Sequence, residues 1–161
     1  YMDLDRVGIT AVDNLANTVY GLLNHPDFYK VGVLHCFFEP RFGFVPIGEM
    51  HDGISVDKTA RPVTRHAEDY VDSLKGKLLL IQGMLDMFTP ASTFRLVDAL
   101  QKANKDFDML CLPSAGHEVT TYGLRRNWDY LVTHLQGVEP PQEFNLSTGP
   151  DLLLNAATEY V

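Results

Sequence analysis

The sequence lacks any apolar run long enough to cross a membrane. A transmembrane helix needs roughly 18 or more consecutive apolar residues, and every apolar run here is interrupted by polar residues before that length. The first residues also lack the basic and apolar regions of a secretory signal peptide. We therefore expect no association with a membrane.

Basic residues are also scarce. The chain has 13 lysines and arginines against 21 aspartates and glutamates, which gives a formal net charge of −8. Proteins that bind nucleic acid rely on basic patches to neutralise phosphates, so this balance argues against a nucleic-acid partner. An acidic surface otherwise favours solubility and indicates no particular ligand.

Cysteine is rare as well. The two cysteines, Cys36 and Cys111, lie in the apolar stretches GVLHCFF and MLCLP. Small buried thiols are the usual occupants of such stretches, so we expect neither a disulfide nor a reactive thiol at these positions. The cysteines do not fix the cellular compartment.

The chain does have enough apolar residues for one folded domain. Hydrophobic residues make up 45% of its 161 residues, and we find neither repeats nor a low-complexity segment. The regular pattern ends shortly after Pro140. We therefore expect one domain over residues 1–141, followed by a C-terminal tail over residues 142–161.

Apolar stretches that suit strands alternate with stretches of helical spacing. The run KLLLIQ has no polar alternation, which is typical of a strand covered on both faces. The alternation predicts an α/β fold with a mainly parallel sheet and helices on both faces. Strands are expected at residues 7–9, 30–38, 77–82 and 107–112, helices at 14–24, 90–104 and 125–135, and loops with short helices at 39–73.

Two chemically active side chains follow the last two predicted strands. Asp86 comes shortly after the third strand and His117 shortly after the fourth. Functional groups of open parallel sheets gather at the carboxyl ends of strands. An acid and then a histidine is also the chain order of the last two members of a hydrolase triad, where the carboxylate orients the imidazole that moves the proton. Each residue alone is more simply a loop residue or a helix cap, but their combination favours a catalytic pair.

Five stretches carry a resemblance that extends from residue 3 to about residue 143: DLDRVGI, NHPDFYKVGV, KGKLLLIQGMLD, FRLVDALQKANKDFDMLCLPSAGH and RRNWDYLVTHLQGVEPP. On these the chain resembles the C-terminal catalytic domain of the prolyl oligopeptidase family of serine peptidases, on the dipeptidyl-peptidase IV and acylaminoacyl-peptidase side. The resemblance implies the C-terminal half of an α/β-hydrolase fold. It also implies that Asp86 and His117 are similar to the family's triad aspartate and histidine, and that an active chain would act on a peptide-like substrate. We expect neither a cofactor nor a metal.

The nucleophile turn departs from the family's pattern. Family members usually carry Gly-x-Ser-x-Gly-Gly directly after RVGI, whereas this chain has TAVDNLA. Asp13 falls where the serine would be, and Leu15 falls where a glycine normally lets the helix approach the strand. The turn therefore lacks the nucleophilic hydroxyl and is expected to have a different geometry.

Other departures affect groups that hold the substrate in the family. Met87 and Phe88 stand where Asp-Asn usually follows the triad aspartate, and Glu118 follows His117 where glycine is common. The residues IGEMH stand near the place of a Tyr-Thr-Glu-Arg-Tyr-like motif whose aromatic residues line a proline-sized pocket. The family domain also has about eight strands, of which this chain would supply the last four.

These observations leave three functional hypotheses open. In the first, the chain is a non-catalytic relative of a serine peptidase, in which Asp86 and His117 are relics. In the second, it is an active hydrolase, either completed by another chain or using Asp13 as a carboxylate nucleophile, as in haloalkane dehalogenases and epoxide hydrolases. Ser114 is a poor alternative nucleophile, since no sharp turn presents it.

In the third hypothesis, the chain is a binding or assembly module. The first strand would lie inside the sheet of a complete hydrolase, and here its partner on one side is missing from the chain. Unpaired strand edges are templates for pairing with another chain. We therefore expect a homodimer, or another association through the open sheet edge, with the first strand or the apolar segment at residues 152–154 at the contact.

Overall fold

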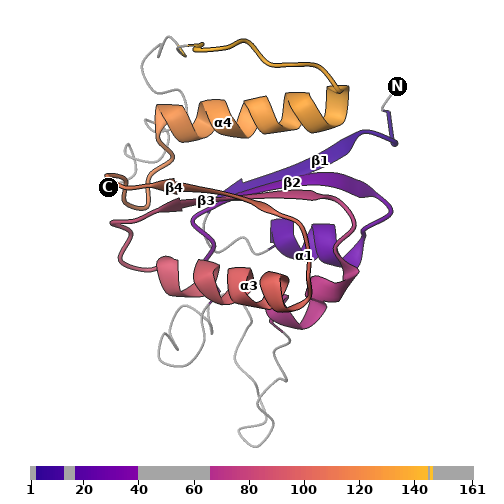
Figure 1. Ribbon diagram of the computed structural model, residues 1–161, viewed down its shortest axis with the longest axis horizontal. Coiled ribbons are helices and arrows are strands. Elements are labelled where there is room, and N and C mark those ends of the chain that lie inside the picture. The colour runs from indigo at the N-terminus through magenta and orange to yellow at the C-terminus, as the bar shows by residue number, and fades with distance from the viewer. Residues whose placement is uncertain (1–2, 13–16, 40–65, 145, 147–161) are drawn as a thin grey trace, which may run out of the picture.

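A four-stranded parallel sheet forms the centre of the computed structural model, which describes residues 3–12, 17–39, 66–144 and 146 (Figure 1). The strands are β1 (Val7–Val12), β2 (Tyr29–His35), β3 (Lys77–Gly83) and β4 (Asp108–Leu112), and they lie in the order β1-β2-β3-β4. All three pairings between neighbouring strands are parallel. The predicted α/β class and the parallel sheet are therefore confirmed.

Helices cover both faces of this sheet. In Figure 1, α1 (Asn17–Asn24) and α3 (Pro90–Lys102) lie on one face, and α4 (Thr121–Leu131) lies on the other. The short 3₁₀-helix η1 (Ala67–Ser73) contacts α1 and α3, and the π-helical turn η2 (Val132–Gln136) continues from α4. The described sheet is thus the middle layer of three.

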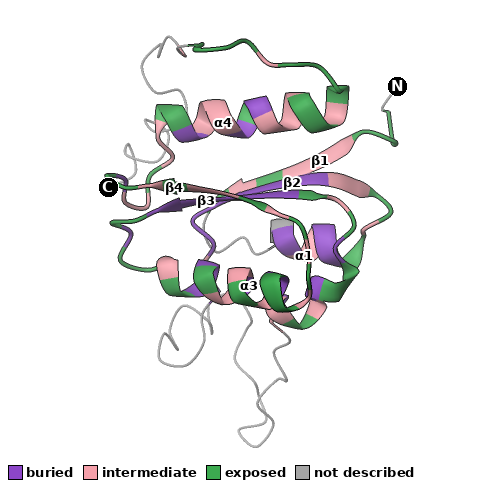
Figure 2. Ribbon diagram, viewed as in Figure 1, coloured by how far each residue is buried: buried purple, intermediate pink, exposed green. Residues whose placement is uncertain are grey.

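The core is divided by the sheet into two clusters, because successive side chains of a strand point to opposite faces. On the face of α1 and α3, Leu34 and Leu80 pack with Leu22 and Leu96, all of them at most 1% exposed. On the face of α4, the smaller cluster contains Val33, Leu79 and Ile81. In Figure 2 most of β2 is coloured as buried, and β2 and β3 are buried along most of their length, whereas β1 and β4 consist of intermediate and exposed residues.

Some element boundaries differ from the sequence-based expectation. β1 continues beyond residue 9 to Val12, because Thr10, Ala11 and Val12 pair with residues 33–35 of β2. Helix α4 begins at Thr121 instead of Arg125, because the Thr120 hydroxyl caps it by accepting a hydrogen bond from the backbone N–H of Gly123. The expected turn residues from Asp13 onward, the segment 40–65 and the tail from residue 147 lie outside the described residues.

The prediction that both cysteines are buried is half wrong. Cys36 is 3% exposed, whereas Cys111 is exposed, and both thiols are free. Cys111 lies on β4, the last strand of the described sheet, where Met109 packs against the larger core cluster but Cys111 is open to solvent. The apolar sequence of β4 therefore led to an overestimate of burial, because β4 is at the edge of the described sheet.

Helix α4 buries a histidine at the end of β2. His35 is 2% exposed, and its Nε2 atom has no hydrogen-bond partner among the described residues. Gly123 of α4 faces the His35 ring, since a Cβ atom at that position would be in ordinary van der Waals contact with it at 3.5 Å. Burial lowers the pKa of His35 from 6.5 to about 4, because the charged imidazolium would lose its hydration.

This burial predicts that the protein loses stability in mild acid. The unfolded chain binds a proton on His35 near pH 6.5, while the folded chain resists it until about pH 4, so the contribution is full above pH 6.5 and is lost as the pH falls to 4. We expect His35→Leu to remove up to about 3 kcal/mol of this pH dependence. Denaturant unfolding at several pH values measures it.

The exposed His25 provides the matched control. His25→Gln should leave the slope of stability against pH between 6.5 and 4 as it is in the parent chain. An unchanged slope in His35→Leu would show that His35 does not titrate as a buried group.

Candidate active site at the carboxyl ends of β2, β3 and β4

The two predicted triad residues meet at one end of the sheet. Asp86 follows β3 and His117 follows β4, and these strands are neighbours. The Nδ1 atom of His117 lies 2.7 Å from the Oδ2 atom of Asp86. The expected contact between carboxylate and imidazole is therefore present, and its catalytic role remains a prediction.

The loop after β3 holds the Asp86 carboxylate in a fixed orientation. Its Oδ1 atom accepts hydrogen bonds from the backbone N–H of Phe88 at 2.8 Å and of Thr89 at 3.3 Å. Its Oδ2 atom accepts a hydrogen bond from the Thr89 hydroxyl and also faces His117. The side chain of Asp86 is completely buried. These partners leave the carboxylate little freedom to rotate away from the imidazole.

The same contacts keep Asp86 ionised. Burial by itself would raise the pKa of Asp86, but the hydrogen bonds from Thr89, from the backbone of Phe88 and from His117 outweigh it and lower the pKa to about 2. A carboxylate has no proton to donate, so the Nδ1–H of His117 donates to Asp86. In this tautomer the lone pair of the ring lies on Nε2. This is the tautomer that a triad histidine uses.

His117 is the accessible member of the pair. Its side chain is 39% exposed, and its ring meets Phe88 edge-on with centroids 6.2 Å apart. Glu118, at the position where the family commonly has glycine, accepts a hydrogen bond from the backbone N–H of Gly116 at 2.9 Å. Glu118 therefore stabilises the loop that carries His117.

Backbone contacts join the loops after β3 and β4. The N–H of Met84 donates to the carbonyl of Leu112 at 3.0 Å, and the N–H of Leu85 donates to the carbonyl of Ala115 at 2.9 Å. Gly83 lies so close to the second loop that a Cβ atom there would be 2.0 Å from the carbonyl oxygen of Gly116. This close approach sets the spacing between Asp86 and His117.

Cys36 is a third member of the site that the sequence analysis missed. It directly follows β2, with a positive φ of 50°, and its Sγ atom lies 3.8 Å from the carbonyl oxygen of Gly116. Its sulfur and the donor atoms of Asp86 and His117 all lie within 4.8 Å of one another. The signal was its position at the carboxyl end of a strand next to β3.

The other residues that the sequence singled out lie apart from this group or outside the described residues. Asp13, at the nucleophile position, lies outside the described residues, which end at Val12 on this side of the gap. Ser114 is exposed on the turn after β4. Met87, which replaces a polar residue of the family pattern, is 82% exposed.

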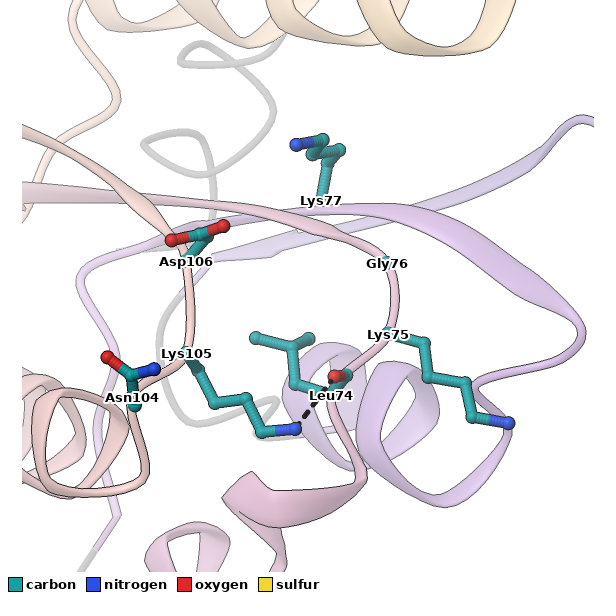
Figure 3. Close-up of a pocket in the computed structure, with 7 residues that line it drawn as sticks. All are labelled: Leu74, Lys75, Gly76, Lys77, Asn104, Lys105 and Asp106. Carbon is teal, nitrogen blue, oxygen red and sulfur yellow. Dashed lines mark hydrogen bonds between the residues drawn. The ribbon is translucent and has the colours of Figure 1, made fainter.

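A cavity of about 210 Å³ lies at the opposite ends of the strands (Figure 3). Its walls come from the segments that lead into β3 and β4, and the Lys105 ammonium donates to the carbonyl of Leu74 at 3.3 Å across it. It is therefore separate from the Asp86–His117 pair. The lining residues are Leu74, Lys75, Gly76, Lys77, Asn104, Lys105 and Asp106.

Within the described part of the chain, no helix has the length and apolar character required to traverse a membrane.

Comparison with known proteins identifies the fold. The model of the prolyl oligopeptidase family matches residues 1–137. Dipeptidyl peptidase 4 of Porphyromonas gingivalis superimposes with a TM-score of 0.70 at 24% identity, over 84% of this chain and 20% of that one. An acylaminoacyl peptidase of Pyrococcus horikoshii superimposes with a TM-score of 0.64 at 16% identity, over 88% of this chain and 26% of that one.

These solved structures share the α/β-hydrolase fold with the chain, as expected for a sheet with the strand order of a hydrolase C-terminal half. The chain spans about a fifth to a quarter of the length of these relatives. Among curated proteins, none gives a significant match.

Proposed function

This chain belongs to the prolyl oligopeptidase family, and from that premise we propose that it is a relative of dipeptidyl-peptidase IV-like serine peptidases without peptidase activity of its own. The observation that carries the proposal is Asp13, which stands where the family has its nucleophilic serine. Asp86 and His117 keep their contact, so of the three triad positions it is the nucleophile that lacks its usual group.

The chemistry of acyl transfer explains why the residue at position 13 determines whether the chain can act as a serine peptidase. In a serine peptidase, the imidazole takes a proton from the serine hydroxyl while the hydroxyl oxygen attacks the carbonyl carbon. The orienting acid and the imidazole are available in Asp86 and His117. Asp13 carries no hydroxyl, and Leu15 replaces the glycine that lets the turn close tightly. The first covalent step therefore has no nucleophile of the family's type.

A fluorophosphonate probe tests this proposal, because it reacts only with an activated serine. We expect no covalent adduct by mass spectrometry after prolonged incubation, alongside full labelling of an active family member. An adduct on Ser114 or another serine, lost in His117→Ala, would overturn the proposal.

The intact pair favours a second candidate, an active hydrolase with Asp13 as its nucleophile. An ionised Asp86 that orients His117 is the arrangement needed to activate water. In this reaction a carboxylate oxygen of Asp13 would displace a halide or open an epoxide, and water activated by His117 would then hydrolyse the resulting ester. Halide release that disappears in Asp13→Asn would support this candidate, and its absence from a broad halide, epoxide and ester screen would reject it.

Exposed apolar side chains beside the pair favour a third candidate, a binding or assembly module. Leu85 is 69% exposed, Met87 82% and Phe88 45%. In the described sheet β1 pairs with β2 alone, so no described strand pairs with its other edge, and unpaired strand edges are templates for pairing with another chain.

We expect this edge to make the chain self-associate, as a two-fold dimer. Sedimentation velocity at rising concentration measures this, with and without the residues after Gln142, because the tail is the alternative partner for the edge. A truncated chain that remains monomeric up to about 100 μM, a weak-binding concentration, would contradict the expectation.

A further inference from the structure

Three potential metal ligands converge at the ends of three neighbouring strands. Cys36 follows β2, Asp86 follows β3 and His117 follows β4. Each offers one donor atom, the Cys36 sulfur, a carboxylate oxygen and an imidazole nitrogen, and these atoms lie within 4.8 Å of one another. The cluster therefore combines a thiol with the two members of the candidate catalytic pair.

We propose that Cys36, Asp86 and His117 form a binding site for Zn²⁺. Thiolate, imidazole and carboxylate are the ligand types that zinc prefers, and three protein ligands leave a fourth position for water. Tetrahedral zinc with bonds of about 2.0–2.3 Å separates its ligand atoms by roughly 3.3–3.7 Å. The contact of 2.7 Å between Nδ1 and Oδ2 would have to widen by about half an ångström to admit the ion.

The surroundings of the site already hold two ligands in place. Asp86 receives hydrogen bonds from the backbone N–H groups of Phe88 and Thr89, which fix the direction of its oxygens. Cys36 is anchored by its own N–H, which donates to the carbonyl of Ile81 at 2.8 Å. Partners of this kind orient metal ligands and strengthen binding. The partly exposed His117 provides a route for the ion from solvent.

The proton balance of binding is simple. Asp86 is already a carboxylate, and ligation through Nδ1 requires His117 to carry a proton on Nε2 only, so that the Nδ1 lone pair faces the ion. Cys36 must lose its thiol proton, so one zinc–sulfur bond forms and one proton is released to solvent. Because zinc competes with that proton for the sulfur, it binds more tightly as the pH rises.

A second cluster, Glu39, His66 and Glu68, has similar spacing but is a weaker candidate. The Oε1 atom of Glu39 already accepts hydrogen bonds from the Tyr20 hydroxyl and from the backbone N–H of Ala67, which leaves Oε2, 3.3 Å from Nδ1 of His66, as its one available ligand atom. The guanidinium of Arg95 lies 3.2 Å from a Glu68 oxygen, and its fixed positive charge would repel a cation.

Cobalt substitution gives the decisive test, because a cobalt–thiolate bond produces a charge-transfer band in the near ultraviolet. The metal-free chain with Cys111→Ser is titrated with Co²⁺, and Zn²⁺ is then added to displace it. Cys36 is the only cysteine left in this variant. We expect a band that saturates at one equivalent and is abolished by zinc. If no saturable band appears, the proposal is wrong, and this result does not depend on substituting any residue of the site.

Cys36→Ser then identifies the ligand. With Cys111 retained, this variant should lose the band and bind zinc at least about 100-fold more weakly, while circular dichroism shows the parental fold. A band that persists would place the metal on Cys111 and reject the site. Calorimetry of the parent chain in buffers of different ionisation enthalpy should count at least one proton released. The apparent Kd should fall about tenfold per pH unit for each proton released. A Kd that does not change with pH would also reject thiolate ligation.

This inference rests on the geometry of the three side chains and not on the proposed loss of peptidase activity. Zinc on Nδ1 would hold His117 in the tautomer opposite to that of a triad. An active chain would therefore be inhibited by zinc, and an inactive chain would still bind it.

Discussion

Xaa-Pro dipeptidyl substrates should remain intact in the presence of the purified chain, with a kcat on the order of 10⁶-fold below that of a complete triad enzyme. This is the loss that accompanies removal of the serine from a triad, since the remaining groups act only together with it. Asp13 offers a carboxylate in place of the hydroxyl, and His117 has no proton to take from it at neutral pH. Release of a fluorogenic leaving group from a Gly-Pro substrate measures the rate.

Restoring the serine should not restore activity. Asp13→Ser supplies a hydroxyl, but Leu15 still occupies the glycine position of the turn, so the hydroxyl is not expected to reach the imidazole in the required geometry. The double variant Asp13→Ser with Leu15→Gly removes both obstacles, and comparison with Asp13→Ser separates the effect of the missing hydroxyl from that of the crowded turn. Turnover by the parent chain that is abolished in His117→Ala would disprove the proposed loss of function.

Gly83→Ala is expected to cause the largest loss of stability of any single methyl addition in the site. The new Cβ atom would meet the backbone carbonyl oxygen of Gly116 at 2.0 Å and that of Ala115 at 2.7 Å, and neither can move without shifting the loop. We expect a loss of about 3 kcal/mol or more, with a fall in melting temperature of roughly 10 °C. Thermal unfolding by circular dichroism measures this.

Gly116→Ala is the matched control on the other side of the same contact. Its Cβ atom would meet the Oε2 atom of Glu118 at 2.9 Å, so this exposed side chain must shift and weaken its hydrogen bond to the Gly116 N–H, whereas the backbone can stay in place. We expect a loss below about 1 kcal/mol. Because the displaced loop carries His117, Gly83→Ala should also remove the downfield proton resonance of the Nδ1–H bonded to Asp86, and Gly116→Ala should keep it. Equal stabilities of the two variants would contradict the close contact.

The sheet was predictable from sequence because its two central strands consist of unbroken apolar runs. KVGVLH and KLLLIQ exclude any arrangement that leaves one face in water. The ends of elements were less accessible. Thr10, Ala11 and Val12 look like turn residues until β2 pairs with them. Gly123 disfavours a helix, but its backbone N–H is satisfied by the Thr120 cap at the start of α4.

The candidate site was predictable in part for the same reason. The strand order brings Asp86 and His117 together, and an acid and a histidine that follow two neighbouring strands predict this contact. No comparable pattern predicts a role for Cys36, since a cysteine in an apolar run is usually inert. Only the turn at the end of β2, where Cys36 has a positive φ, directs the sulfur toward the other two residues.

The position of β4 at one border of the described sheet has a consequence for how the site opens. β4 exposes Asp108 and Cys111 and buries none of its side chains fully, whereas β2 and β3 are buried along most of their length. Amide hydrogen exchange should therefore be faster in β4 than in its neighbours, because border strands detach at a lower free energy than the whole domain unfolds. His117 follows β4, so each such opening separates it from Asp86. The lifetime of the pair is then set by the detachment of one strand, and a ligand that bridges Asp86 and His117 would slow exchange in β4 first.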